Sequence, residues 1–239
     1  VLDIKNLSYE INGRVLFKDI NIQFAKGMRV GIVGKNGSGK STFLKTIMGQ
    51  LEPTTGSVTI AGRTQINYSD QAKLFLNPEK TVLEEIGDNS DLVYIGGNTI
   101  SARAYLKRFL FSEIQLKTVI KNLSGGEKSR LILAKILKSG GNFLILDEPT
   151  NDLDLSTLRI LEEALTSFDG CVLVVSHDRF FLNRVATHIL GIEEGGNTRF
   201  MAGDYTLYKT SNVKRKDLDA DDSQSTKTES NSIEPTKKV

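Results

Sequence analysis

The chain has 239 residues, of which 39% are hydrophobic and 25% are charged, and its formal net charge is +2. This balance is typical of a folded globular protein and gives no general sign of nucleic-acid or membrane binding. The single cysteine, Cys171, excludes an intrachain disulfide framework. The sequence contains no run of about 18 apolar residues, so it predicts no membrane span. We therefore expect a cytoplasmic protein. Because Val1 already lies in an apparent strand, we also expect a piece of a longer chain.

The N-terminal third predicts a small antiparallel sheet and then a strand, a loop and a helix. Residues 1 to about 33 alternate apolar and polar side chains, as strands of a half-buried sheet do. Val30–Val33 is a short apolar run typical of a buried parallel strand, and Lys40–Met48 has helical spacing. Pro53–Gly56 then predicts a turn before a further strand at Ser57–Ile60.

A complete GxxxxGK[ST] sequence joins the apolar strand to the helix. Its residues are Gly34, Lys35, Asn36, Gly37, Ser38, Gly39, Lys40, Ser41 and Thr42. Glycines at such a turn let successive backbone amides converge on phosphate oxygens, with the helix dipole behind them. Lys40 would place its charge at the terminal phosphates, and the Ser41 hydroxyl would hold Mg²⁺. An ordinary glycine turn before a helix does not require Gly, Lys and Ser in this register.

The middle of the chain predicts helices. Residues 72 to about 123 have helical patterns, with Ser101 capping a helix at Ala102–Phe111. The sequence LSGGE, Leu123–Glu127, then opens a helix at Gly126–Leu137.

The start of that helix has two interpretations. Ser124 could be its N-cap, with Glu127 in the first turn. The Ser124 hydroxyl and the amides of Gly125 and Gly126 could equally form an anion site. Both can hold, because the cap and the anion site use the same groups.

Two later strands end in polar side chains suited to hydrolysis. Asp147 closes the apolar run Phe143–Leu146, so its carboxylate should emerge at the carboxyl edge of the sheet and assist Mg²⁺. Glu148 follows and suits a base that polarises an attacking water. His177 ends the strand Cys171–Ser176 at the same edge, where it could contact the terminal phosphate.

The end of the chain predicts a hairpin and then a loss of structure. Gly195–Asn197 is a turn between the strands Ile189–Ile192 and Arg199–Met201. We expect one domain at residues 1–211. In residues 212–239 no aromatic side chain occurs and apolar residues are few, which predicts a disordered linker or tail. Lys214–Lys216 could contact nucleic acid, although a solvated charge run has the same composition.

These motifs, in this order, resemble the nucleotide-binding domain of the ATP-binding cassette (ABC) superfamily, from about Val1 to Tyr208. The resemblance implies an α/β P-loop NTPase fold with a mostly parallel core sheet and a small antiparallel β subdomain. It also implies a helical signature lobe at about residues 72–135, and an ATPase that uses ATP and Mg²⁺.

The resemblance extends to individual residues. Gln71 looks like the Q-loop glutamine that senses Mg²⁺ and water, and Asp154 looks like the D-loop aspartate that communicates between paired cassettes. LSGGE is the signature, which faces the nucleotide of a second cassette. Where the family has an aromatic side chain under the adenine this chain has Ile11, with Tyr9 two residues earlier, so either could contact the base.

Three sequences resemble one branch, the ABC-F family: DEPTNDLD, VSHDRFFLNRVAT and GDYTLY. This branch consists of soluble proteins with two cassettes in one chain, no membrane domain and roles mostly at the ribosome. The stretch AYLKRFLFS and the DLD ending suggest the second cassette of a Uup-like member. Two alternatives stay open: a subunit that energises a membrane transporter, and a nucleotide-dependent switch with little turnover.

Overall fold

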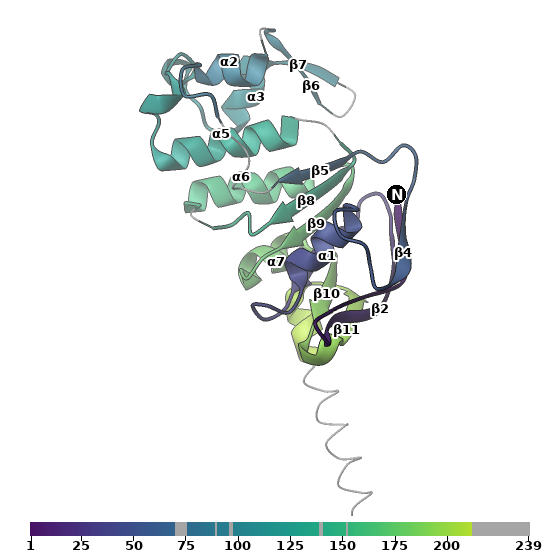
Figure 1. The fold of residues 1–239 in the computed structure, drawn as a ribbon. Helices are drawn as coiled ribbons and strands as arrows, with labels where there is room; N and C mark the ends of the chain where they lie inside the picture. Colours follow the sequence, from purple (N-terminus) through teal and green to yellow (C-terminus); the bar gives the residue numbers. More distant parts are fainter. Residues whose placement is uncertain (70–75, 89, 96–97, 139–140, 152, 212–239) are drawn as a thin grey trace, which may run out of the picture.

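The computed structural model describes residues 1–211 except 70–75, 89, 96–97, 139–140 and 152 (Figure 1). The described residues form a parallel-rich central sheet, a small antiparallel sheet beside it, and a lobe made mostly of helices. This is the α/β architecture that the sequence predicts. No helix in the described part is long and apolar enough to cross a membrane.

The central sheet has six strands in the order β11-β10-β3-β9-β8-β5. Their bounds are β11 Thr198–Ala202, β10 His188–Ile192, β3 Arg29–Val33, β9 Cys171–Val175, β8 Phe143–Asp147 and β5 Ile66–Ser69. All neighbours are parallel except β10 and β11, which form the predicted hairpin. The edge strand β5 had no counterpart in the sequence prediction.

The antiparallel sheet has the order β2-β1-β4. Its strands are β1 Leu2–Ile11, β2 Arg14–Phe24 and β4 Thr55–Ile60. The alternating pattern at the start of the chain therefore gives two strands of this sheet, and the strand predicted after Pro53 becomes the third.

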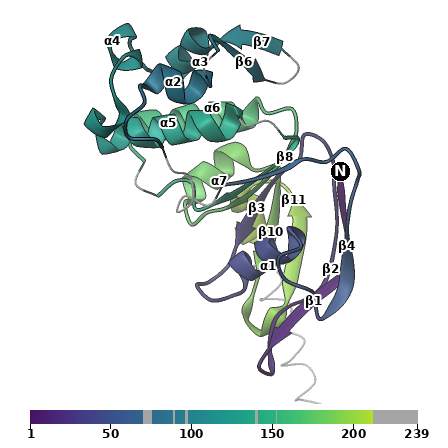
Figure 2. The ribbon, with the colours of Figure 1, turned by 45° about the horizontal axis from the view of Figure 1, so that its top comes forward.

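The described part contains seven labelled α-helices, α1 to α7, and two short 3₁₀ helices, η1 and η2. They are α1 Lys40–Ile47, α2 Val82–Gly87, α3 Ala102–Arg108, α4 Glu113–Leu116, η1 Ile120–Asn122, α5 Gly125–Lys138, α6 Leu155–Thr166, α7 Arg179–Val185 and η2 Glu194–Gly196. Residues 205–211 are also helical. In Figures 1 and 2, α2 and α3 lie across α5 from the central sheet.

The helical lobe differs from the prediction in two places. A hairpin, β6 Leu92–Ile95 with β7 Asn98–Ser101, interrupts the stretch that was predicted to be helical throughout. Ser101 caps α3 as predicted, since its hydroxyl accepts a hydrogen bond from the Ala104 amide at 3.1 Å. The helix ends at Arg108 rather than Phe111 because Leu110 adopts a φ of 59°, which a helix cannot contain.

The two faces of the central sheet pack against different partners. Alternate residues of β8 and β9 explain this, because successive side chains of a strand point to opposite faces. Leu144 and Val174 belong to a core with α5, α6, α7 and the helical lobe. Ile145 and Leu173 belong to a second core with α1 and the antiparallel sheet. The sheet is thus buried on both faces, and its carboxyl edge is where polar side chains emerge.

Gly191 allows the helical segment at residues 205–211 to pack on β10. A Cβ at this position would lie within 1.8 Å of the Tyr208 hydroxyl oxygen and 2.5 Å of its ring carbon. Tyr208 is itself only 6% exposed, so its ring has little freedom to move away.

We expect Gly191→Ala to lower the free energy of unfolding by about 1–3 kcal/mol, the usual cost of overpacking a core. Urea unfolding followed by circular dichroism measures it. Gly62→Ala is the matched control, since no atom lies within 4 Å of a Cβ there. Equal stability of the two variants would show that Tyr208 is not packed against Gly191.

Candidate functional site

The phosphate loop lies between the end of β3 and the start of α1. Gly37 and Gly39 have φ angles of 75° and 104°, in the left-handed region that favours glycine. At Gly34 a Cβ would lie 2.5 Å from both the Ile192 carbonyl oxygen and the Ser38 hydroxyl oxygen. The Ser38 hydroxyl oxygen is buried and has no hydrogen-bond partner among the described residues. A buried polar group without a partner in a glycine loop suits a site that receives phosphate oxygens.

Lys40 lies in the mouth of this loop. Only 9% of the residue is exposed, and its ammonium donates to the carbonyl oxygens of Gly34 at 2.8 Å and Lys35 at 3.1 Å. Burial lowers the pKa of Lys40, and the carboxylates of Glu148 and Asp147 oppose that shift. The charge of Lys40 therefore faces two carboxylates across the same space.

Ser41 and Asp147 meet below the loop. The Ser41 hydroxyl donates to Asp147 Oδ2 at 3.4 Å. A hydroxyl and a carboxylate oxygen at adjoining positions are the kind of hard ligands that Mg²⁺ takes in nucleotide sites, usually together with substrate phosphates. The residues present therefore fit a Mg²⁺ ion.

Glu148 and His177 form a pair at the ends of β8 and β9. The His177 amide donates to Glu148 Oε2 at 3.2 Å, and the His177 ring atom Nε2 lies 3.4 Å from Glu148 Oε1. Oε1 is buried and accepts no hydrogen bond from the described residues. A carboxylate beside an imidazole at a sheet edge is an arrangement that suits a general base.

The backbone of Glu148 is strained. Its φ is 49°, which costs a residue other than glycine on the order of 1–3 kcal/mol. The turn persists because the Glu148 amide donates to the Val175 carbonyl oxygen at 2.9 Å and the Asn151 amide approaches the Glu148 carbonyl oxygen at 3.3 Å.

These groups enclose one cavity of about 440 Å³. The residues that line it are Leu16, Asn36, Gly37, Gly39, Lys40, Ser41, Thr42, Asp147, Glu148, Asn151, Val175 and His177. Most of the predicted phosphate loop therefore meets the two carboxylates and His177 in one cavity, while Gly34 and Lys35 line a neighbouring cavity and Ser38 lines neither. Leu16 and Asn151 were not predicted to line the 440 Å³ cavity. Asn151 follows Glu148 closely enough in sequence to have suggested it, whereas Leu16 carries no sequence signal.

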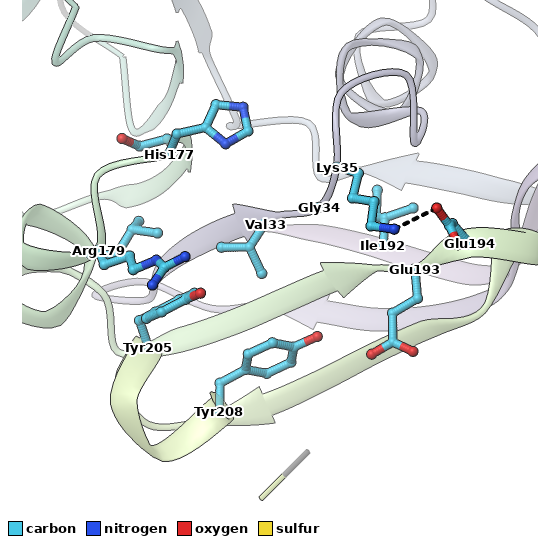
Figure 3. A pocket seen from close by; sticks show the side chains of 12 residues that line it. Val33, Gly34, Lys35, His177, Arg179, Ile192, Glu193, Glu194, Tyr205 and Tyr208 are labelled. Carbon is cyan, nitrogen blue, oxygen red and sulfur yellow. Dashed lines mark hydrogen bonds and ion pairs between the residues drawn. The ribbon is translucent and has the colours of Figure 1, made fainter. Parts of the chain in front are cut away.

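A second cavity of about 540 Å³ adjoins the first at His177. Figure 3 shows Arg179 and Tyr205 on one side of it and the ion pair of Lys35 with Glu194 on the other. The Lys35 ammonium lies 2.7 Å from Glu194 Oε1, and the Arg179 guanidinium lies 5.8 Å from the centre of the Tyr205 ring. His177 thus stands between the two cavities.

The LSGGE residues lie outside the 440 Å³ cavity that contains Lys40 and Glu148. Ser124, Gly125, Gly126 and Glu127 are not among the described residues that line it. Ser124 and Glu127 form a capping box: the Ser124 amide donates to Glu127 Oε2 at 2.7 Å, and the Glu127 amide donates to the Ser124 hydroxyl oxygen at 3.4 Å. The Ser124 hydroxyl and amide lower the pKa of Glu127.

Asp154 caps α6 next to that same helix start. Its Oδ1 accepts from the Thr157 amide at 2.7 Å, and its Oδ2 lies 3.9 Å from the Arg130 guanidinium. A Cβ on Gly126 would lie 3.1 Å from Asp154 Oδ2. Within this chain, Asp154 therefore links the segment after Glu148 to the start of α5.

The predicted adenine contacts stay predictions. The Tyr9 ring packs against Phe17 with centroids 5.9 Å apart, and Ile11 is 49% exposed at the end of β1. Neither lines the 440 Å³ cavity. Gln71 lies outside the described residues, as do Lys214–Lys216.

Comparison with known proteins places these motifs in a family. Residues 17–151 match the protein family described as ABC transporter. This chain belongs to that family. The matched region runs from β2 through the phosphate loop and the signature to Asn151, so the chain is an ABC ATPase cassette, and its reaction is ATP hydrolysis.

Curated relatives include two kinds of protein. The chain is 44% identical over 221 residues to the energy-dependent translational throttle protein EttA of Escherichia coli K12, covering 92% of this chain and 40% of that protein. It is 42% identical over 205 residues to the ATP-binding protein Uup of Haemophilus influenzae, covering 86% of this chain and 32% of that protein. The chain therefore spans less than half the length of these relatives.

Solved structures share the fold. The ATP-binding cassette MJ0796, in a dimeric post-hydrolysis state bound to ADP and Pi, is 26% identical to this chain with a TM-score of 0.61. The match covers 84% of this chain and 98% of that one.

The cap at Asp154 generates a pH-dependent prediction. Hydrogen bonds from Ser156 and Thr157 lower the pKa of Asp154 from 3.8 to about 2. Because the folded pKa is the lower one, the ionised carboxylate stabilises the fold above pH 3.8, and this stabilisation is lost as the pH falls from 3.8 through 2.

We expect Asp154→Ala to cost about 1 kcal/mol of unfolding free energy at pH 7, and less at pH 3. Denaturant titrations at both pH values measure the difference. Asp154→Asn is the control, because asparagine retains a cap but has no carboxylate to titrate. A cost for Asp154→Ala that is equal at both pH values would contradict the assigned ionisation.

Proposed function

We propose that this chain is one cassette of an ABC-F ATPase whose sites are completed by a second cassette. The observation that carries the proposal is the separation of two sets of groups. Lys40, Asp147, Glu148 and His177 share one cavity, while Ser124–Gly126 lies outside it. Because the signature residues lie outside the cavity that holds the phosphate loop, they suit a role at the nucleotide site of another cassette.

The predicted catalytic residues have separate roles in this proposal. The phosphate-loop amides and Lys40 bind the phosphates, and Glu148 takes a proton from the attacking water. His177 contacts the terminal phosphate and the same water. Gln71 assists at the metal and the water, as the family resemblance implies.

Mg²⁺ fits the oxygen ligands of Ser41 and Asp147, and when bound it neutralises charge on the phosphates. The Ser41 hydroxyl and Asp147 Oδ2 lie 3.4 Å apart, so this chain would supply two oxygen groups to hold the metal. The donors from the partner's signature would add hydrogen bonds to the charge that develops during hydrolysis.

The name of the EttA relatives supports a role in translation. EttA proteins are named translational throttles, and this chain is 44% identical to one of them over 221 residues. We therefore assign this ATPase cassette to a protein that acts in translation. Under this proposal the full protein acts in the cytoplasm on ribosomes. The identities to EttA and Uup, 44% and 42%, do not separate these two kinds of protein. The assignment of this chain to the second cassette of a Uup-like protein therefore rests on the short sequences AYLKRFLFS and DLD.

Sedimentation with ribosomes tests the translation role. We would add purified natural protein carrying this cassette to ribosomes with ATP and measure how much of it pellets. Binding that depends on ATP supports the role. A protein that stays in the supernatant and instead stimulates a reconstituted membrane transporter would favour transport, which the ABC transporter family match also admits.

We expect Glu148→Gln to leave ATP affinity close to that of the wild-type protein and to slow hydrolysis about 100-fold or more, because the base is lost while the phosphate loop and Asp147 are intact. Nucleotide titration and phosphate release measure the two effects separately. Glu163→Gln, on the exposed side of α6, is the control. Turnover near the wild-type rate would remove Glu148 from its role and would favour a different water-activating group.

We expect the specific activity of the isolated chain to rise with its concentration, because two copies must meet to complete a site. Ser124→Arg should suppress that rise, while Ser167→Arg, at the exposed end of α6, should not. Phosphate release over a dilution series measures the effect. Hydrolysis that is fast and independent of concentration would contradict a site shared between cassettes.

A further inference from the structure

Two loops at the carboxyl edge of the central sheet each carry one half of the Glu148–His177 pair. The first runs from Asp147 at the end of β8, and the second starts after Val175 at the end of β9. The loops touch through two side chains that have so far been given no role. The Thr150 hydroxyl and the Ser176 hydroxyl lie 3.0 Å apart and share a hydrogen bond.

The Ser176 hydroxyl is fixed on more than one side. Ser176 is only 2% exposed, and its oxygen also accepts a hydrogen bond from the Asp178 amide at 3.0 Å. Asp178 in turn caps α7, since its Oδ1 accepts from the amides of Phe180 at 2.9 Å and Phe181 at 3.1 Å. The residues on both sides of His177 are therefore anchored, one to the first loop and one to a helix.

The His177 ring is less firmly held than the backbone around it. The His177 amide donates to Glu148 Oε2 at 3.2 Å, but the ring itself lies 3.4 Å from Glu148 Oε1 without a hydrogen bond to it. The His177 side chain is also 55% exposed, against 22% for Glu148, so burial does not fix the ring. The distance between ring and carboxylate therefore depends on the backbones of the two loops, and the Glu148 backbone is in a conformation that needs outside support.

We propose that Thr150 and Ser176 are positioning residues for hydrolysis, acting as a hydroxyl latch that sets the distance between Glu148 and His177. The latch lies two residues after Glu148 and directly before His177, so both side chains are within a short, constrained stretch of it. Neither Thr150 nor Ser176 lines the 440 Å³ cavity that holds Lys40, Ser41 and Asp147, and Ser176 lines the adjoining 540 Å³ cavity beside His177. Losing the latch should disturb the chemical step and leave nucleotide binding intact. This inference rests on the proposed roles of Glu148 and His177.

A purely structural role for the same bond predicts something different. If the bond only stabilises the sheet edge, its removal would lower the unfolding temperature, and ATP affinity and turnover would be affected to the same degree. Comparing the loss of turnover with the loss of ATP affinity in the same variant separates the two interpretations.

The test uses the natural protein that contains this cassette. Thr150→Val removes the hydroxyl at nearly constant shape, Thr150→Ser keeps the hydroxyl, and Ser176→Ala removes the partner. Thr166→Val is the matched control, because the Thr166 hydroxyl donates to a helix carbonyl of Glu162 at 2.8 Å far along α6. For each variant we would measure kcat, KM, the affinity for Mg·ATP and the melting temperature.

We expect Thr150→Val and Ser176→Ala each to lower kcat about 10-fold or more, with Mg·ATP affinity within about 2-fold of the wild-type value, since small misplacements of reacting groups are costly. The double variant should be no slower than Ser176→Ala, because Ser176→Ala already removes the bond to Thr150 together with the one from the Asp178 amide. Thr150→Ser should restore most of the rate, and Thr166→Val should match the wild-type protein.

Three results would overturn the latch. They are an unchanged kcat in Thr150→Val, a loss of affinity as large as the loss of kcat, and no recovery in Thr150→Ser. If Thr150→Val does not fold, Ser176→Ala and the recovery in Thr150→Ser still decide the question. Glu148→Gln measured beside them separates the two proposals: an active Glu148→Gln contradicts the proposed function itself, whereas an inactive one beside a fully active Thr150→Val contradicts only the latch.

Discussion

The parallel register of β3, β9 and β8 is the constraint on which the rest of this molecule depends. Pairing of Ile32 with Val175 and of Val175 with Asp147 brings three strand ends to one line. Each strand then releases a different group: the phosphate loop, the His177 loop, and the Asp147–Glu148 pair. Parallel strands end at the same edge of a sheet, so the loop after β3 meets the loops after β8 and β9, more than a hundred residues later in the chain. Burial of both sheet faces fixes that register.

Around this edge the chain combines preorganised and weakly held elements. The phosphate loop is tied across its mouth, because the Lys40 ammonium donates to the carbonyl oxygens of Gly34 and Lys35. Glu148 is instead held in strain, and His177 is largely exposed. Strain at one residue persists only where neighbours over-determine its backbone. That requirement gives the hydroxyls of Thr150 and Ser176, which no phosphate contacts in this proposal, a reason to be where they are.

The sequence was informative wherever a local rule dictates the structure. The phosphate loop, the capping box of Ser124 with Glu127, the Ser101 cap and the carboxylate at the end of β8 all follow from residue types at fixed spacing. The hairpin Leu92–Ser101 and the edge strand β5 were missed, because four-residue strands carry almost no periodic signal and their pairing is set by distant partners. Leu16 reaches the cavity only because β2 folds back over Gly39, a contact that no spacing encodes.

The place of the signature follows from the same geometry. Ser124 precedes α5 with its amide and hydroxyl bonded to Glu127, so the chain's own carboxylate occupies two groups at a helix start suited to an anion. Asp154 then ties this helix start to the segment that follows Glu148. Residues 148–154 therefore join Glu148 to this helix start by a short covalent path. Under the proposed function, in which the helix start acts at the site of a second cassette, this path would let each site of a pair influence the other.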